Sequence, residues 1–255
     1  MSEKENAAAE SEGKPIQVEG LRKSFGEQRV LTGIHLEAGR GETVSVLGQS
    51  GTGKSVLLKL MIGLERADSG SIRIHGKEVT GLRRQEWKEL RKRMGFLFQG
   101  AALYDSLTVE ENVSFPLERH SRLTRAERNK RTRELLAMVG MEREGDKLPG
   151  QISGGMQKRV GLARALALEP DILLCDEPTA GLDPITAAEI DALILKMQEE
   201  RNVTSIVVTH DLPSARTISD RLALLRDGRI LIEGSFEELE DSEDPFVAQF
   251  LHRES

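Results

Sequence analysis

Residues 48–55 combine glycines with a lysine and a hydroxyl at the spacing G-x-x-x-x-G-K-[ST]. Glycines let backbone N–H groups turn inward around phosphate oxygens, and the positive end of a following helix adds to that attraction. Lys54 would neutralise the outer phosphates of a nucleotide, and the Ser55 hydroxyl would bind Mg2+. The pattern predicts a phosphate-binding loop, with an accidental glycine-rich turn as the alternative. The loop reads Gly48, Gln49, Ser50, Gly51, Thr52, Gly53, Lys54 and Ser55.

An acidic pair lies at the end of another apolar run. Residues 172–175 have the pattern of a buried strand, and the strand ends at Asp176 and Glu177. Ligands bind at the carboxyl ends of strands in open α/β sheets, which is where these two carboxylates would lie. Asp176 would orient Mg2+ or its water, and Glu177 would polarise the attacking water as a general base. Plain surface charge is the weaker reading, because the pair follows a buried strand downstream of a phosphate loop.

Three further positions could contact a nucleotide. Ser153 would cap a helix whose first glycines leave backbone amides open, which makes a second positive helix end. His210 follows the apolar run 206–208, where its imidazole could reach the γ-phosphate. Phe25 lies beside a turn at Gly26 and could stack on adenine, or it could be an ordinary strand-end aromatic. Two phosphate-binding helix ends far apart in the chain suggest a nucleotide sandwiched between two surfaces.

The spacing of apolar residues predicts the elements that carry these side chains. Residues 43–47 read as a strand and residues 56–64 as a helix, so the phosphate loop has its expected strand–loop–helix context. Further strands or hairpins are expected at residues 16–18, 34–38, 70–79, 94–98, 206–208 and 222–232. The fold class is therefore α/β, with a P-loop NTPase core on a mostly parallel sheet, an antiparallel β subdomain and an inserted helical subdomain.

The inserted subdomain is expected over about residues 104–168. Capping boxes at residues 108–111 and 124–127 predict two helix starts, because a hydroxyl and a carboxylate there satisfy the first free amides. The second helix is expected to stop at Gly140, whereas Pro116 is expected to end or kink the first. An inserted subdomain of this kind can rotate, which matters for mechanism.

The composition limits the domain organisation and the partners that the protein can have. The 255 residues suffice for one core, here residues 15–234, preceded by a loose tail over 1–14 and followed by an acidic and helical extension over 235–255. The net charge of −6 gives no bulk attraction to nucleic acid or to an anionic membrane, and the basic run 83–93 reads as a solvated helix face rather than a binding patch.

Cysteine usage and hydropathy indicate the cellular compartment in which the protein is expected. The single cysteine, Cys175, excludes an internal disulfide framework and reads as a small buried hydrophobe. The chain does not open on a pattern like a secretory signal, so an intracellular protein is expected. No stretch reaches the roughly 18 to 20 apolar residues of a membrane span, so any work at a membrane is expected to pass through a partner.

In their order along the chain, these motifs resemble the nucleotide-binding subunit of ATP-binding-cassette (ABC) transporters, and the resemblance covers about residues 16–234. It implies an ATP hydrolase that works as a head-to-tail dimer, in which residues 153–156 of one subunit cap the ATP held by the phosphate loop of the other. It also implies adenine stacking on Phe25 and contacts to Mg2+ and water from Gln99. Contact of His210 with the γ-phosphate and communication across the dimer through Asp183 are implied as well.

The cap consists of Ser153, Gly154, Gly155 and Met156. The family's usual motif is Leu-Ser-Gly-Gly-Gln, and Met156 replaces its final glutamine. The backbone cradle is kept, but any contact of the glutamine side chain is put in doubt.

Other residues resemble the Mla or Mce lipid-transport ATPases of double-membrane bacteria. These are residues 91–94, 97–99, 101–103 and 112–117, the Ser-Gly-Gly-Met sequence, and residues 244–245 and 249–251 near the end of the chain. The resemblance implies permease partners in the inner membrane, an Mce-type lipid-binding protein, and phospholipid moved between the two membranes. The chain would then lie on the cytoplasmic side of the inner membrane, held there by the permease.

Other functions remain open at this point. A nucleic-acid or ribosome-associated ATPase of the same superfamily would predict tandem cassettes, a long coiled-coil insertion or a basic face, and none is apparent. A nucleotide-gated adaptor without turnover would be marked by loss of the Glu177 or His210 equivalent, and both are present. Within transporters, the runner-up is a system for amino acids, metals or drugs.

Overall fold

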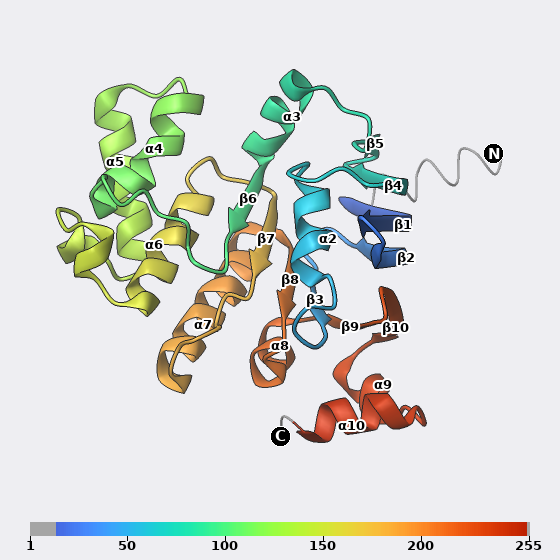
Figure 1. Cartoon of the computed structure of the whole chain (residues 1–255). Coiled ribbons are helices and arrows are strands. Elements are labelled where there is room, and N and C mark those ends of the chain that lie inside the picture. The colour runs from blue at the N-terminus through green and yellow to red at the C-terminus, as the bar shows by residue number, and fades with distance from the viewer. Residues whose placement is uncertain (1–13, 254–255) are drawn as a thin grey trace.

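Two sheets form the centre of the protein in a computed structural model that describes residues 14–253 (Figure 1). The smaller sheet is antiparallel, with the strand order β2-β1-β4-β5. Its strands are β1 (Ile16–Phe25), β2 (Gln28–Ala38), β4 (Ser69–Ile74) and β5 (Lys77–Glu78). The long β1–β2 hairpin turns at Gly26, whose φ of 60° suits glycine, as the sequence predicted.

The larger sheet has the strand order β10-β9-β3-β8-β7-β6, and the strands from β9 to β6 run parallel. It consists of β3 (Thr43–Leu47), β6 (Met94–Leu97), β7 (Ile172–Asp176), β8 (Thr204–Thr209), β9 (Arg221–Arg226) and β10 (Arg229–Gly234). Every residue of β3, β6, β7 and β8 is buried. Strands covered on both faces carry continuous apolar runs, which is why these strands were visible in the sequence.

Helices cover both faces of the larger sheet. In β7, Ile172 and Leu174 face a core shared with the antiparallel sheet and α2 (Lys54–Met61). Leu173 and Cys175 face the opposite core, which contains α7 (Pro184–Arg201). Burial raises the pKa of the Cys175 thiol to about 12, so the thiol is an inert core group as expected.

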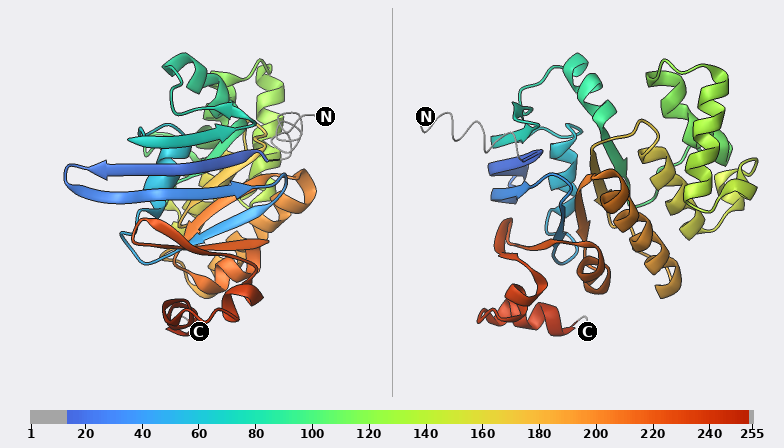
Figure 2. Two further views of the ribbon diagram at one scale, coloured as in Figure 1. Left: turned by 90° about the vertical axis from the view of Figure 1, so that its right-hand side faces the viewer. Right: turned by 180° about the vertical axis from the view of Figure 1, so that it is seen from behind.

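The chain between β6 and β7 carries α4 (Val109–His120), α5 (Arg125–Met138) and α6 (Gly154–Ala165), which stand to one side of the larger sheet (Figures 1 and 2). Both predicted capping boxes are present, at Thr108 and at Thr124. Pro116 was expected to end or kink its helix, and it does not end it, because α4 continues to His120. Burial of apolar side chains on both sides of the proline, Val113 and Leu117, offsets the missing N–H donor.

The C-terminal segment forms α9 (Phe236–Glu240) and α10 (Pro245–Arg253), with α8 (Leu212–Ile218) nearby. These two helices lie away from α4 and α5 (Figures 1 and 2). A small core of Leu47, Leu222, Leu239, Val247 and Phe250 joins them to the larger sheet. The helix at residues 236–240 was not predicted, although Ser235 and Glu238 form its capping box. The predicted tail over residues 1–14 lies outside the described residues except for Lys14.

The basic run at residues 83–93 forms α3 (Arg84–Leu90) and a 3-10 turn (Arg91–Arg93). None of the α3 residues is buried, which fits a solvated face. Arg91 departs from that expectation, because its guanidinium donates to the carbonyls of Ile62 and Gly63 at 2.9 and 2.8 Å. These carbonyls follow the last turn of α2, where a cation is favourable. Helix α2 is correspondingly shorter than predicted and ends at Met61.

No helix among the described residues is long and apolar enough to cross a membrane.

A buried carboxyl between α7 and α8 makes the stability of the protein depend on pH. The Ser214 hydroxyl donates to Asp191 Oδ1 at 2.6 Å, and Asp191 is 5% exposed. Burial raises the pKa of Asp191 to about 6, although the Ser214 hydrogen bond opposes this. In the unfolded chain the same carboxyl has a pKa of about 3.9. The free energy of unfolding therefore decreases as the pH rises from about 4 to about 6.

We predict that Asp191→Asn removes this loss. The free energy of unfolding of the variant, relative to the parent chain, should rise by up to about 3 kcal/mol between pH 4 and pH 7. Urea unfolding at both pH values measures the difference. A difference between the two chains that is constant with pH would show that Asp191 is not a buried acid with a raised pKa.

Candidate nucleotide-binding and catalytic site

The phosphate loop connects β3 to α2 and folds around a buried lysine. The Lys54 ammonium donates to the carbonyls of Gly48 at 2.7 Å and Gln49 at 3.1 Å, so its charge lies at the centre of the loop. Gly53 precedes α2 with a φ of 102°, and a Cβ there would come within 2.8 Å of Val30. Glycine is required at this position both for the left-handed backbone and for the close approach of β2.

The carboxyl end of β7 meets the start of α2. The Ser55 hydroxyl donates to Asp176 Oδ1 at 2.7 Å, and burial raises the pKa of Asp176. A hydroxyl and a carboxylate in contact are oxygen ligands of the type that Mg2+ prefers, so this pair fits the predicted metal position. Within residues 14–253, no group of three or more His, Cys, Asp or Glu side chains is arranged to hold a metal ion.

Glu177 lies between the phosphate loop and His210. Its Oε1 is 3.4 Å from the Lys54 ammonium, and its Oε2 is 2.8 Å from His210 Nδ1. The backbone N–H of His210 and the hydroxyl of Thr209 also donate to Oε2, each at 3.2 Å. Four groups therefore fix this carboxylate at the edge of the sheet, and Glu177 itself has a φ of 49°, which is unusual for a residue other than glycine.

A cleft of about 600 Å3 brings most of the predicted site residues together. Its walls include Phe25 and Val30 from the β1–β2 hairpin, Gln99 after β6, and the residues Gln49, Ser50, Gly51, Gly53, Lys54, Ser55, Glu177 and His210. Phe25 is 46% exposed, and the Lys23 ammonium lies 4.8 Å from the centroid of its ring. The cleft therefore combines an aromatic surface with phosphate-binding groups.

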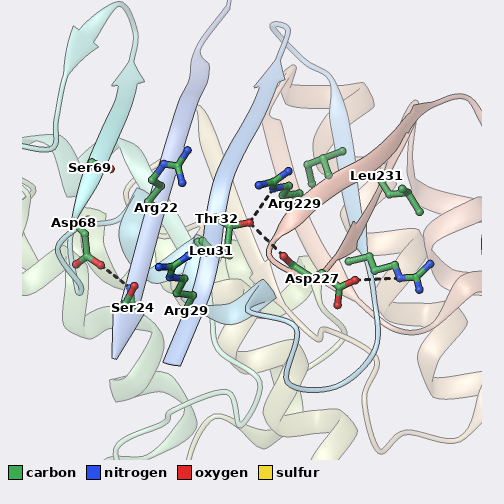
Figure 3. A pocket seen from close by; sticks show the side chains of 12 residues that line it. Arg22, Ser24, Arg29, Leu31, Thr32, Asp68, Ser69, Asp227, Arg229 and Leu231 are labelled. Atoms are coloured by element: carbon green, nitrogen blue, oxygen red, sulfur yellow. Dashed lines mark hydrogen bonds and ion pairs between the residues drawn. The ribbon is translucent and has the colours of Figure 1, made fainter. Parts of the chain in front are cut away.

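A larger hollow of about 690 Å3 lies on the other side of the β1–β2 hairpin (Figure 3). Strand alternation places Ser24 and Arg29 there, whereas Phe25 and Val30 line the cleft. Arg229 crosses from β10 and donates to the Thr32 hydroxyl at 3.2 Å (Figure 3). The hollow contains none of the predicted site residues, so chemistry rather than size identifies the site.

The cap residues lie elsewhere in the chain. The Ser153 hydroxyl caps α6 by accepting from the Met156 N–H at 3.3 Å, and Ser153 and Gly154 are exposed. Asp183 caps α7 and accepts from the Ile185 and Thr186 N–H groups at 3.1 Å each. Neither Asp183 nor any residue of 153–156 lines the cleft. One chain therefore brings together the loop, the acids and His210, but leaves its cap outside.

Two contacts of Glu177 and its loop were missed at the sequence level. The Lys158 ammonium, from α6, donates to the Glu177 carbonyl at 2.8 Å, and burial lowers the pKa of Lys158. The hydroxyl of Thr179 donates to Asp211, which caps α8, at 3.0 Å. The only sequence signal for Lys158 is helical phase, because the buried residues Gly155 and Leu162 lie on the same side of α6.

Comparisons with known proteins agree with this arrangement. A family model described as ABC transporter matches residues 31–180. The probable ribonucleotide transport ATP-binding protein mkl of Mycobacterium tuberculosis (strain H37Rv) is 43% identical over 96% of this chain and 69% of its own length. The methionine import ATP-binding protein MetN of Rhizobium johnstonii is 43% identical over 91% of this chain and 64% of its own length.

Solved structures give the same result. An ATP-binding cassette solved as a dimer in a post-hydrolysis state bound to ADP and Pi superposes with a TM-score of 0.81 at 37% identity. The match covers 86% of this chain and 98% of that one. The fold therefore is that of an ABC cassette.

We predict that Lys54→Ala weakens ATP binding at least tenfold, because the loop loses the buried cation that faces the phosphates. Titration with a fluorescent ATP analogue measures the affinity. Lys196→Ala, which removes an exposed lysine of α7, serves as the control and should bind like the parent chain. Equal affinity of the parent and Lys54→Ala would contradict a phosphate site at this loop.

Proposed function

We propose that this chain drives the movement of phospholipid between the membranes of a double-membrane bacterium. The chain belongs to the ABC transporter family and is an ATP-hydrolysing subunit of that family. The observation that supports ATP turnover is the position of Glu177, which contacts Lys54 and His210 inside the cleft. A carboxylate held beside the phosphate loop suits a general base, whereas a module that only binds nucleotide has no need of one.

The catalytic step would be in-line attack of water on the γ-phosphate. Glu177 would accept the proton of that water, and His210 would keep the carboxylate aligned while facing the phosphate. Lys54 would stabilise negative charge on the phosphoryl oxygens during transfer. Ser55 and Asp176 would hold Mg2+, with Gln99 contacting the ion and its water, and the bound ion would neutralise phosphate charge.

We further propose that the working unit is a head-to-tail dimer. The cap at residues 153–156, of which Ser153 and Gly154 are exposed, would close on the ATP in the cleft of a second copy, with backbone amides at the start of α6 facing phosphate. The similar cassette that was solved as a dimer with ADP and Pi supports this arrangement. Met156 would contribute its backbone there, and Asp183 would lie where the two copies communicate.

Closure of the dimer would be transmitted to a permease in the inner membrane. Gln99 lines the cleft and lies in the chain between β6 and the helices α4, α5 and α6, so it would pass a change at the cleft on to these helices. We propose residues 104–168 as the mobile helical subdomain within a nucleotide-binding domain of residues 15–234. The chain would be held on the cytoplasmic side of the inner membrane by the permease.

The lipid assignment rests largely on residues that take no part in the catalytic step. The resemblance to Mla or Mce ATPases involves Arg91, which caps α2, and residues 249–251, which lie in α10. It implies a permease and an Mce-type lipid-binding protein as partners. The names of the relatives, which refer to ribonucleotide and methionine transport, favour an importer of small polar molecules as the second candidate.

Purification of the tagged chain from membranes of its host tests the substrate. Mass spectrometry should identify a permease, an Mce-type protein and bound phospholipid in the complex. A complex with a permease and a soluble small-molecule-binding protein, free of bound phospholipid, would contradict the lipid proposal and leave the ATPase assignment intact.

We predict that Glu177→Gln abolishes steady-state ATP hydrolysis and retains ATP binding. The amide still fills the position beside Lys54 and His210, but it cannot accept the proton of the attacking water. Phosphate release and nucleotide titration measure the two properties separately. Turnover close to that of the parent chain would overturn the general-base role.

A further inference from the structure

A buried lysine of α6 reaches the backbone of the proposed catalytic residue. Lys158 is only 5% exposed, and its ammonium donates to the Glu177 carbonyl at 2.8 Å. The same carbonyl accepts a longer hydrogen bond from the Ala180 N–H at 3.3 Å. Burying an ammonium is unfavourable unless it donates to nearby acceptors, so the contact with the Glu177 carbonyl holds this lysine in place.

The carbonyl that Lys158 binds belongs to a residue with strained backbone. The φ of Glu177 is 49°, in the left-handed region that costs energy for any residue with a side chain. Its N–H still donates to the Val208 carbonyl at 2.8 Å, as a continuation of the sheet. The chain therefore turns at Glu177 itself, and its carbonyl after the turn is fixed by Ala180 and Lys158. A strained residue of this kind keeps its conformation only where the surroundings hold it.

We propose that Lys158 is a positioning residue that holds the Glu177 backbone turn, and so aims the Glu177 carboxylate at the nucleotide cleft. This inference rests on the proposed function, in which Glu177 is the general base. Lys158 does not line the cleft, so it acts through Glu177 and not on the nucleotide.

The same contact joins the cap to the catalytic residue within one chain. Ser153, at the start of α6, belongs to the cap, and Lys158 lies on the next turn of the same helix. In the proposed dimer, the start of α6 faces the ATP of the second copy, whereas Lys158 holds the Glu177 that acts on the ATP of its own copy. Lys158 therefore provides a direct mechanical path between the two nucleotide sites.

Substitutions at residue 158 separate positioning from plain packing. Lys158→Met keeps the aliphatic stem and removes the donor, and Lys158→Gln keeps an N–H donor on a side chain one bond shorter. The matched control is Gln157→Met, since Gln157 also donates to a carbonyl, that of Pro149 at 3.0 Å, but does not contact Glu177. Steady-state ATP hydrolysis gives kcat and KM, and thermal melting reports folding.

Lys158→Met should lower kcat at least tenfold with KM for ATP within twofold of the parent chain, and Lys158→Gln should recover at least half of the lost activity on a logarithmic scale. Gln157→Met should keep the parent kcat. A Lys158→Met chain with parent kcat, or Lys158→Gln no more active than Lys158→Met, would overturn the proposal. If Lys158→Met does not fold, Lys158→Leu takes its place as the variant without a donor, with a lower kcat and an unchanged KM expected and a parent kcat contradicting the proposal.

ATP hydrolysis by the parent chain distinguishes failure of the proposed function from failure of the positioning role. A parent chain that does not hydrolyse ATP would refute the proposed function itself. A parent chain that hydrolyses ATP, together with Lys158 variants of equal activity, would refute only the positioning role.

Discussion

The arrangement of the site depends on the Glu177 carboxylate, which is held between the Lys54 ammonium and the His210 imidazole. Glu177 lies at the end of a fully buried strand, with the Lys54 ammonium 3.4 Å away on one side and His210 2.8 Å away on the other. Lys54 comes from the loop after β3, and His210 from the loop after β8, which pairs with β7. Because β3, β8 and β7 pair in parallel, their carboxyl ends bring these groups to the same end of the sheet.

A second constraint is that one chain supplies only part of the nucleotide site. The phosphate loop, Glu177, His210 and the aromatic Phe25 line the cleft, whereas the cap at residues 153–156 lies outside it. In the proposed dimer the missing side would be supplied by another copy. Two clefts would then be closed by two caps, so binding energy from ATP would be spent on bringing subunits together.

Much of this could be predicted because buried parallel strands carry continuous apolar runs and helix starts carry capping boxes. Asp176, Glu177 and His210 were located by the strands that precede them. Contacts that depend on packing between distant segments could not be predicted in this way. Lys158 reaches Glu177 only because α6 packs against the sheet at β6, and Arg91 caps α2 only because the turn after α3 folds back onto it.

Pro116 shows how packing overrides a local rule. Proline disfavours a helix interior, yet α4 continues through it because Val113 and Leu117 are buried against the same core. The acidic stretch at residues 236–240 is the opposite case. The extension over residues 235–255 was predicted to be acidic and helical, but no helix was assigned to residues 236–240, where the Ser235 cap and the buried Leu239 stabilise one.

The most direct test of the half-site is the mass of the Glu177→Gln chain in solution, measured by light scattering with and without saturating ATP. The account predicts that the mass doubles with ATP, and that adding Ser153→Arg keeps the chain monomeric while its ATP affinity is unchanged. A chain that binds ATP and stays monomeric, or that dimerises equally well with Ser153→Arg, would contradict it.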